Sequence, residues 1–212
     1  MLIASYNKAG MGDVLVTMVA PTTGEQVVTT KDDVTQMTLA DNGQLLGYNF
    51  FNASALLPEL ADQAAGQVVL TAAQVATLND HLASAGFDAQ LVADETPKFV
   101  IGYVESMEAH PKSDHLQITQ VQVDGETLQI VCGSPNITDN VKVIVAKPGA
   151  MMPSGQVIWP GELVGVPSAG MICAGRELNL ANAPQKPGCV ILPDDFGATG
   201  DAFDFEKGNH LF

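Results

Sequence analysis

The sequence LQITQVQVDGETLQIVC, residues 116–132, contains two β-type runs joined by a turn. Apolar and polar residues alternate from Leu116 to Val121, and this period of two is typical of a strand with one face inward and one face toward solvent. Asp124 and Gly125 favour a tight turn, which joins this run to a second run at Thr127–Cys132. We therefore predict an antiparallel hairpin here.

Two further β-type runs flank this hairpin at regular intervals, at Phe99–Ser106 and Val141–Ala146. Short strands at this spacing are typical of a β-barrel or a β-sandwich. Five strands coiled into a barrel leave one open face bordered by loops, and barrels of this kind bind oligonucleotides on that face. We expect an all-β domain in the second half of the chain.

The first half of the chain begins with β-forming runs separated by turns. We expect a turn at Gly10 and Gly12, and a hairpin around residues 41–43, where Asp-Asn-Gly tolerates positive φ. The expected strands are Leu2–Tyr6, Val14–Val19, Val34–Leu39 and Gln44–Asn49. The segment from Asn52 to Leu60 fits neither a strand nor a helix clearly.

The clearest helix covers Thr71–Ala85, because Thr71 and Gln74 form a capping-box pair at its start. Apolar residues recur on one of its faces: Val75, Leu78 and Leu82. Gly86 is expected to end the helix. A short strand is expected over residues 89–92, and the polar run 94–97 is the best candidate for a linker between two domains. The first half is therefore predicted to be an α+β domain.

The charge of the chain opposes nucleic-acid binding, which normally needs clustered lysine and arginine. The net charge is −15, with 3 basic and 11 acidic residues in 1–98 and 6 basic and 13 acidic residues in 99–212. Much of the excess acid crowds the C-terminal tail: Asp194, Asp195, Asp201, Asp204 and Glu206. Residues 99–193 alone hold 5 basic and 8 acidic residues, so a small positive groove is compatible with them.

Other classes of site lack their sequence signatures. Cys132, Cys173 and Cys189 are widely spaced and unpaired, so we expect reduced, structural thiols and no disulfide or metal site. No window joins a nucleophile to a base or a glycine loop to a phosphate-binding helix, so we expect neither an enzyme nor a cofactor. With no apolar run of membrane-spanning length and no secretory leader, we expect a soluble, cytoplasmic protein.

Three stretches, in this order and spacing, resemble a known domain: His110–Leu116 (HPKSDHL), Leu128–Asn136 (LQIVCGSPN) and Gly165–Cys173 (GVPSAGMIC). Residues 99–193 resemble the tRNA-binding domain of the bacterial phenylalanyl-tRNA synthetase beta subunit, of some methionyl-tRNA synthetases and of stand-alone tRNA-binding proteins. The resemblance implies an oligonucleotide-binding (OB) fold, a five-stranded barrel.

The N-terminal half resembles the extra domain of two-domain bacterial members of that group, through Tyr6-Asn7-Lys8 and Gly47–Ser54. That resemblance implies an architecture without a mechanism. We therefore expect an α+β domain of unknown role over 1–95 and a tRNA-binding OB-fold domain with an acidic tail over 96–212.

The motifs and the resemblance together nominate seven RNA-binding residues: Lys112, Ser134, Asn136, Lys147, Ser168, Met171 and Arg176. Lys147 follows a predicted strand and is the best-placed single cation for a phosphate. Asn136 can bind a base edge or brace a turn, and Met171 can lie under a base or be buried. Arg176 can bind phosphate or pair with Glu177. Trp159 offers a stacking group where family members commonly carry basic residues.

We predict a non-catalytic tRNA-binding protein that recognises RNA shape through the open barrel face. The alternative is an acidic protein-interaction module that docks a synthetase or another translation protein. Because stand-alone relatives can be dimeric, a homodimer is a side prediction.

Overall fold

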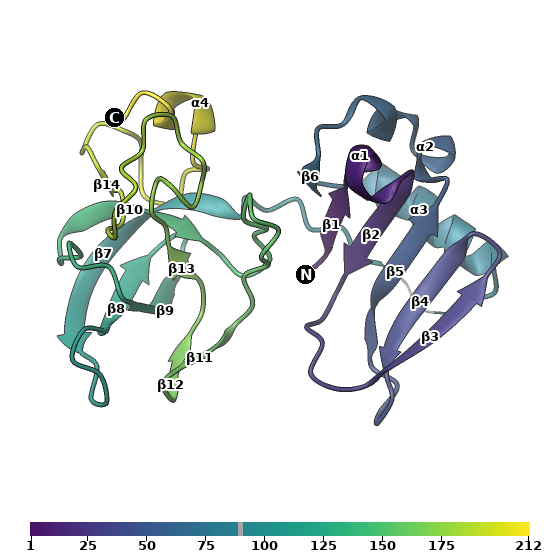
Figure 1. Cartoon of the computed structure of the whole chain (residues 1–212), viewed down its shortest axis with the longest axis horizontal. Helices are drawn as coiled ribbons and strands as arrows, with labels where there is room; N and C mark the ends of the chain where they lie inside the picture. Colours follow the sequence, from purple (N-terminus) through teal and green to yellow (C-terminus); the bar gives the residue numbers. More distant parts are fainter. Residues whose placement is uncertain (89–90) are drawn as a thin grey trace. The chain divides into compact units, whose positions relative to one another are not determined.

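The computed structural model describes residues 1–88 and 91–212 and contains two compact units (Figure 1). The first unit covers Met1–Thr96 and the second covers Pro97–Phe212. Within the described residues, no helix combines the length and the apolar character needed to cross a membrane.

The first unit is built on one antiparallel sheet of six strands in the order β3-β4-β5-β2-β1-β6. The strands are β1 (Ile3–Tyr6), β2 (Val14–Met18), β3 (Gln26–Lys31), β4 (Val34–Leu39), β5 (Leu45–Phe51) and β6 (Gly66–Val68). The helical segments are α1 (Lys8–Met11), α2 (Ala53–Leu56), the 3-10 helix η1 (Pro58–Asp62) and α3 (Ala72–Ser84). α3 runs along one face of the sheet (Figure 1).

The core of this unit lies between the sheet and α3. Thr71 and Gln74 bond each other's backbone and side chain at the start of α3, so the predicted capping box is present. Leu78 and Leu82 on α3 share one buried cluster with Tyr48 and Phe50 on β5. The apolar stripe of the helix therefore covers the apolar face of the sheet, and the predicted α+β fold is confirmed.

The four strands predicted for this unit form with ends shifted by at most two residues, but two strands were missed. β3 is exposed along its whole length, so no buried face imposes an alternating pattern on its sequence. β6 has only three residues. The ambiguous segment 52–60 contains α2 and the start of η1. Of the two glycines expected in a turn, Gly12 follows α1 at φ 77°, but Gly10 lies within α1. Of the strand expected over 89–92, residues 89–90 lie outside the described part, and Leu91 and Val92 are in no strand.

The second unit is a nearly closed antiparallel barrel with the strand order β13-β10-β7-β8-β9. Its main strands are β7 (Phe99–Ala109), β8 (Gln117–Gln122), β9 (Thr127–Cys132), β10 (Val141–Ala146) and β13 (Met171–Ile172). β14 (Ile191–Leu192) pairs with β10, β11 (Gly161–Leu163) pairs with β12 (Val166–Ser168), and α4 (Phe205–Gly208) follows near the C-terminus. The predicted five-stranded barrel and the hairpin at Asp124-Gly125 are confirmed.

The barrel coils because β7 bends and its neighbours approach closely. The pairing of β7 with β8 shifts register between Val104 and Ser106, which marks a bulge in the long strand. A Cβ at Gly102 would lie 2.5 Å from a methyl of Val145, so glycine lets the two strand surfaces interdigitate. The segment after β12 closes the barrel, since the amide of Ala169 donates to the carbonyl of Gln129 on β9 at 2.8 Å.

Candidate nucleic-acid interface

Three hollows in the barrel surface meet at Met171, which lines all of them. Their volumes are about 290, 240 and 390 Å³. Ser134 lines the first, Arg176 the first and the second, and Ser168 the third. Residues from the second and third motif stretches, and Arg176 just beyond them, therefore border one continuous surface, which we call the Met171 surface. Trp159 lines its third hollow.

Met171 and Ser168 are positioned by a tight connection between β12 and β13. Gly170 lies between them at φ 131°, and a Cβ there would lie 2.9 Å from the carbonyl oxygen of Ala146. The Ser168 hydroxyl accepts a hydrogen bond from the backbone N–H of Val131 at 3.1 Å. Ser168 thus joins this connection to β9 and helps to close the barrel beside Met171.

Arg176 is the cation of the Met171 surface, and a carboxylate accompanies it. Its Nη2 lies 3.9 Å from Oε1 of Glu177, and its side chain is 33% exposed. The other oxygen of Glu177, Oε2, accepts from the backbone N–H of Ala174 at 2.8 Å, which fixes the carboxylate in place. Both groups line two of the hollows, so an incoming phosphate would meet a cation whose charge is partly balanced.

Asn136 serves as a brace in the described structure. Its Nδ2 donates to the carbonyl of Cys189 and its Oδ1 accepts from the N–H of Cys189, each at 2.9 Å. A side-chain amide that bonds both groups of one residue acts like one rung of a sheet ladder. Asn136 therefore fixes the segment at Gly188 and Cys189 beside the loop that carries Ser134.

The three cysteines are buried free thiols. Burial raises the pKa of Cys173 to about 12 and that of Cys189 to about 11, and it also raises the pKa of Cys132. Thiols with such pKa values stay protonated at neutral pH and are poor nucleophiles. Among the described residues, no group of three or more His, Cys, Asp or Glu side chains is arranged to hold a metal ion.

Lys112 lies on the loop between β7 and β8, which His110 attaches to the β11–β12 hairpin. His110 is buried, its Nδ1 accepts from the N–H of Lys112 at 3.1 Å, and its Nε2 lies 3.3 Å from the carbonyl oxygen of Leu163. The Lys112 ammonium lies 3.5 Å from the position of a Cβ at Gly165, beside the hairpin tip. Sequence reasoning missed this role of His110, whose signal was only its place before Pro111.

Lys147 is largely buried and is paired with a carboxylate. Its ammonium lies 3.7 Å from Oε1 of Glu126 in the β8–β9 turn, and only 12% of its side chain is exposed. Lys147 follows Ala146, which pairs with Met171 in the barrel sheet, but its ammonium is directed to Glu126.

Comparison with known proteins matches each of the two units to a described family. Residues 21–94 match a family described as "Domain of unknown function (DUF4479)", and residues 99–200 match a family described as "Putative tRNA binding domain". The chain is 47% identical over 203 residues to "Putative tRNA-binding protein YtpR" of Bacillus subtilis, covering 95% of this chain and 99% of that protein.

The barrel unit is also similar to part of a much larger protein. The chain is 46% identical over 110 residues to the phenylalanine–tRNA ligase beta subunit of Oceanobacillus iheyensis, covering 50% of this chain and 14% of that subunit. It is 46% identical over 103 residues to the subunit of Lactiplantibacillus plantarum, of which it covers 13%. The match to YtpR, by contrast, includes both units over nearly their whole length. The chain therefore belongs to the YtpR family, in which the domain of unknown function precedes a domain of the tRNA-binding type.

Proposed function

We propose that this protein binds tRNA without catalysing a reaction, and that it does so through the Met171 surface. The observation that carries the proposal is the meeting of three hollows at Met171, bordered by Ser134, Ser168 and Arg176. A soft apolar side chain surrounded by hydroxyl groups and one cation suits a base face together with the sugar-phosphate chain. The family membership supports tRNA as the ligand, because the relatives' names refer to tRNA.

The mode of binding follows from the charges. With a net charge of −15 and one arginine paired to Glu177, the surface offers few cations to phosphate groups. Such a surface recognises shape through scattered contacts and has little sequence selectivity. We expect modest affinity that falls steeply as the salt concentration rises.

Titration of total tRNA, followed by fluorescence polarisation at about 50 and 200 mM salt, tests the proposal. Arg176→Glu should weaken binding about tenfold or more at the lower salt, because it replaces a phosphate-binding cation with a repelling charge. Lys8→Glu makes the same change of charge on α1 in the other unit and should have a much smaller effect. Absence of measurable binding by the unaltered chain at the lower salt would refute the proposal.

A non-catalytic role is supported by the chemistry beside the surface. The sulfur nucleophiles closest to Ser134 are held protonated, because burial raises the pKa values of Cys132 and Cys189. The alternative is that the chain is an acidic module that docks a synthetase or another translation protein. Pull-down from nuclease-treated lysate separates the two, since an association through RNA should disappear and a direct protein contact should persist.

Self-association is a further part of the proposal, and the strand β3 supports it. All six residues of β3 are exposed and β3 ends one edge of the sheet, so its outer backbone groups have no neighbouring strand within the described sheet. We propose that a second copy of the chain pairs with this edge.

A further inference from the structure

The largest of the described hollows lies beside the Met171 surface. Of the seven residues nominated for RNA binding, Asn136 alone lines this hollow. Its volume is about 460 Å³, within the range of small-ligand sites. It shares Pro135, Pro187 and Gly188 with the hollow that contains Ser134 and Arg176. A ligand on the Met171 surface could therefore continue into it without leaving the protein.

Phe212 forms one wall of this hollow and is 44% exposed. Part of its ring packs against Gly175, where a Cβ would lie 2.9 Å from Cε2 of the ring. Glycine at this position lets the ring lie close to the chain that leads to Arg176. An aromatic ring that is supported on one side and open on another is suited to stack against a flat ligand.

The remaining walls are stiff. Three prolines line the hollow, Pro135, Pro184 and Pro187, and each fixes its own φ angle. The double hydrogen bond between Asn136 and Cys189 holds the segment after Pro187 in place. A cavity that needs little ordering on binding retains more of its interaction free energy.

The charge of the hollow is unusual for this chain. Although the molecule carries 24 acidic residues, the charged side chain in this lining is Lys186, and no Asp or Glu lines it. Lys186 is exposed, and no carboxylate of the described residues forms an ion pair with it. The hollows around Met171, by contrast, contain Glu162 or Glu177.

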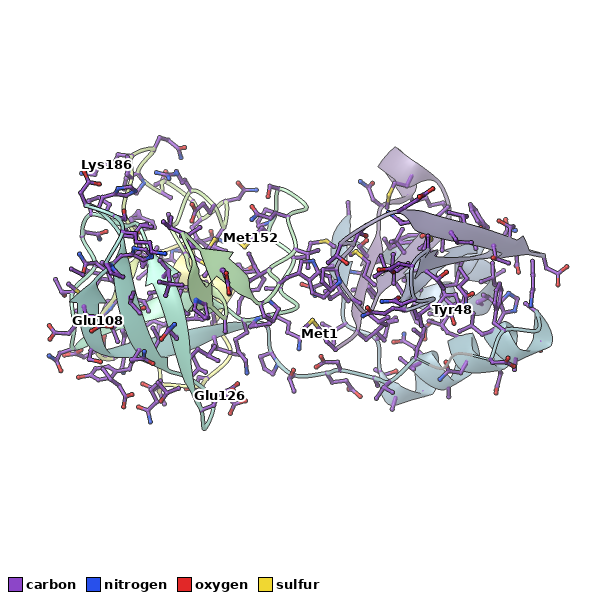
Figure 2. The ribbon with its side chains drawn as sticks, turned by 90° about the horizontal axis from the view of Figure 1, so that it is seen from below. Met1, Tyr48, Glu108, Glu126, Met152 and Lys186 are labelled. Atoms are coloured by element: carbon purple, nitrogen blue, oxygen red, sulfur yellow. The ribbon has the colours of Figure 1, made fainter. Side chains whose placement is uncertain are left out.

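A flat aromatic wall, a stiff apolar rim and one cation fit a ligand with a planar base and an anionic phosphate. We infer that this hollow holds one unstacked nucleotide of the bound RNA, with its base on Phe212 and its phosphate near Lys186. The inference rests on the proposed function and deepens it, because it adds a single-nucleotide site to a surface otherwise expected to bind by shape. Lys186 is exposed at one end of the second unit (Figure 2), so a single strand can approach it.

Titration of total tRNA with the full chain tests the inference through two different signatures. Phe212→Ala should weaken binding by about 5- to 150-fold, the usual range for loss of one base–aromatic stack, and should leave the salt dependence unchanged. Lys186→Gln should instead reduce the magnitude of the slope of log K against log salt by about 0.7, which is the change expected for loss of one phosphate contact to a single strand. Phe212→Tyr, which keeps the ring, should bind like the unaltered chain.

Phe51→Ala is the matched control, because Phe51 is 39% exposed and lies on the first unit. If the unaltered chain binds and Arg176→Glu weakens it, but Phe212→Ala and Lys186→Gln both behave like the unaltered chain, the nucleotide site is refuted and the proposed function stands. If the unaltered chain does not bind tRNA, the proposed function and the nucleotide site are both refuted. If Phe212→Ala loses its fold by circular dichroism, the salt slope of Lys186→Gln decides the question.

Discussion

Gly170 stands between Ser168 and Met171, at the turn from β12 into β13. Its φ of 131° is rarely adopted by other residues, and a Cβ would lie 2.9 Å from the carbonyl oxygen of Ala146. Gly170→Ala should therefore lower the free energy of unfolding by about 1–3 kcal/mol and displace Met171 from the hollows that it lines. Urea unfolding and the tRNA titration measure the two effects.

Gly155→Ala separates backbone strain from crowding at the site. Gly155 also has positive φ, at 87°, but a Cβ there would meet no atom within 4 Å. It should cost stability through strain and leave tRNA binding nearly intact. Equal loss of binding in both variants would contradict a specific role of the β12–β13 connection.

The nominated residues differ in how far their surroundings could be predicted from the sequence. The link between Arg176 and Glu177 was foreseen as one alternative, because the two residues are adjacent in sequence. The partners of Lys147 and Asn136 are Glu126 and Cys189, which are distant in sequence and meet only through the barrel pairing. Side-chain chemistry gave the candidates, but which groups remain free for a ligand depends on these non-local contacts.

At the scale of elements, the strands that were predicted are those with four or more residues and buried apolar side chains. The alternation predicted for the first strand of the hairpin is wrong in detail, because Thr119 is fully buried next to Ile118 in β8, and Ile130 and Val131 are both buried in β9. Both faces of these strands are covered, since Val121 and Ile130 belong to one buried cluster and Ile118 and Val131 to another. β11 to β14 have two or three residues each, too few to show a period. These short strands carry or border Ser168 and Met171, so the part of the fold that builds the site is the part with the weakest sequence signal.

β3 provides a prediction about assembly. The carbonyl of Glu25 accepts from the N–H of Ala40, so by strict alternation Gln26, Val28 and Thr30 turn their backbone groups to the open edge. An antiparallel partner centred on Val28 places Gln26 opposite Thr30 of the other copy and Glu25 opposite Lys31. The edge is thus complementary to itself, and we expect a concentration-dependent dimer.

Val28→Lys should shift this dimer toward the monomer, because it sets two like charges against each other on the symmetry axis. Light scattering over a range of protein concentrations measures the shift. Val69→Lys is the control, since Val69 and Val28 are each 60% exposed and Val69 lies outside the strands. A monomer at every concentration, or a dimer that Val28→Lys leaves unchanged, would contradict pairing through β3.

At the scale of the whole molecule, charge is divided unequally between the two units. Residues 1–96 hold 2 basic and 11 acidic residues, a net charge of −9, whereas residues 97–212 hold 7 basic and 13 acidic residues, a net charge of −6. The candidate RNA surface belongs to the less acidic unit. The first unit therefore carries more than half of the net negative charge of the chain.

A fragment of residues 97–212 should accordingly bind tRNA more tightly than the full chain at about 50 mM salt. The gain should shrink at about 200 mM, because the Debye length falls below about 10 Å and distant charges are screened. Since a dimer would add avidity to the full chain, the fair comparison is with full-length Val28→Lys. Circular dichroism must first show that the fragment is folded. Tighter binding by the full-length variant at both salts would mean instead that the first unit makes favourable contacts with RNA, which no purely repulsive role allows.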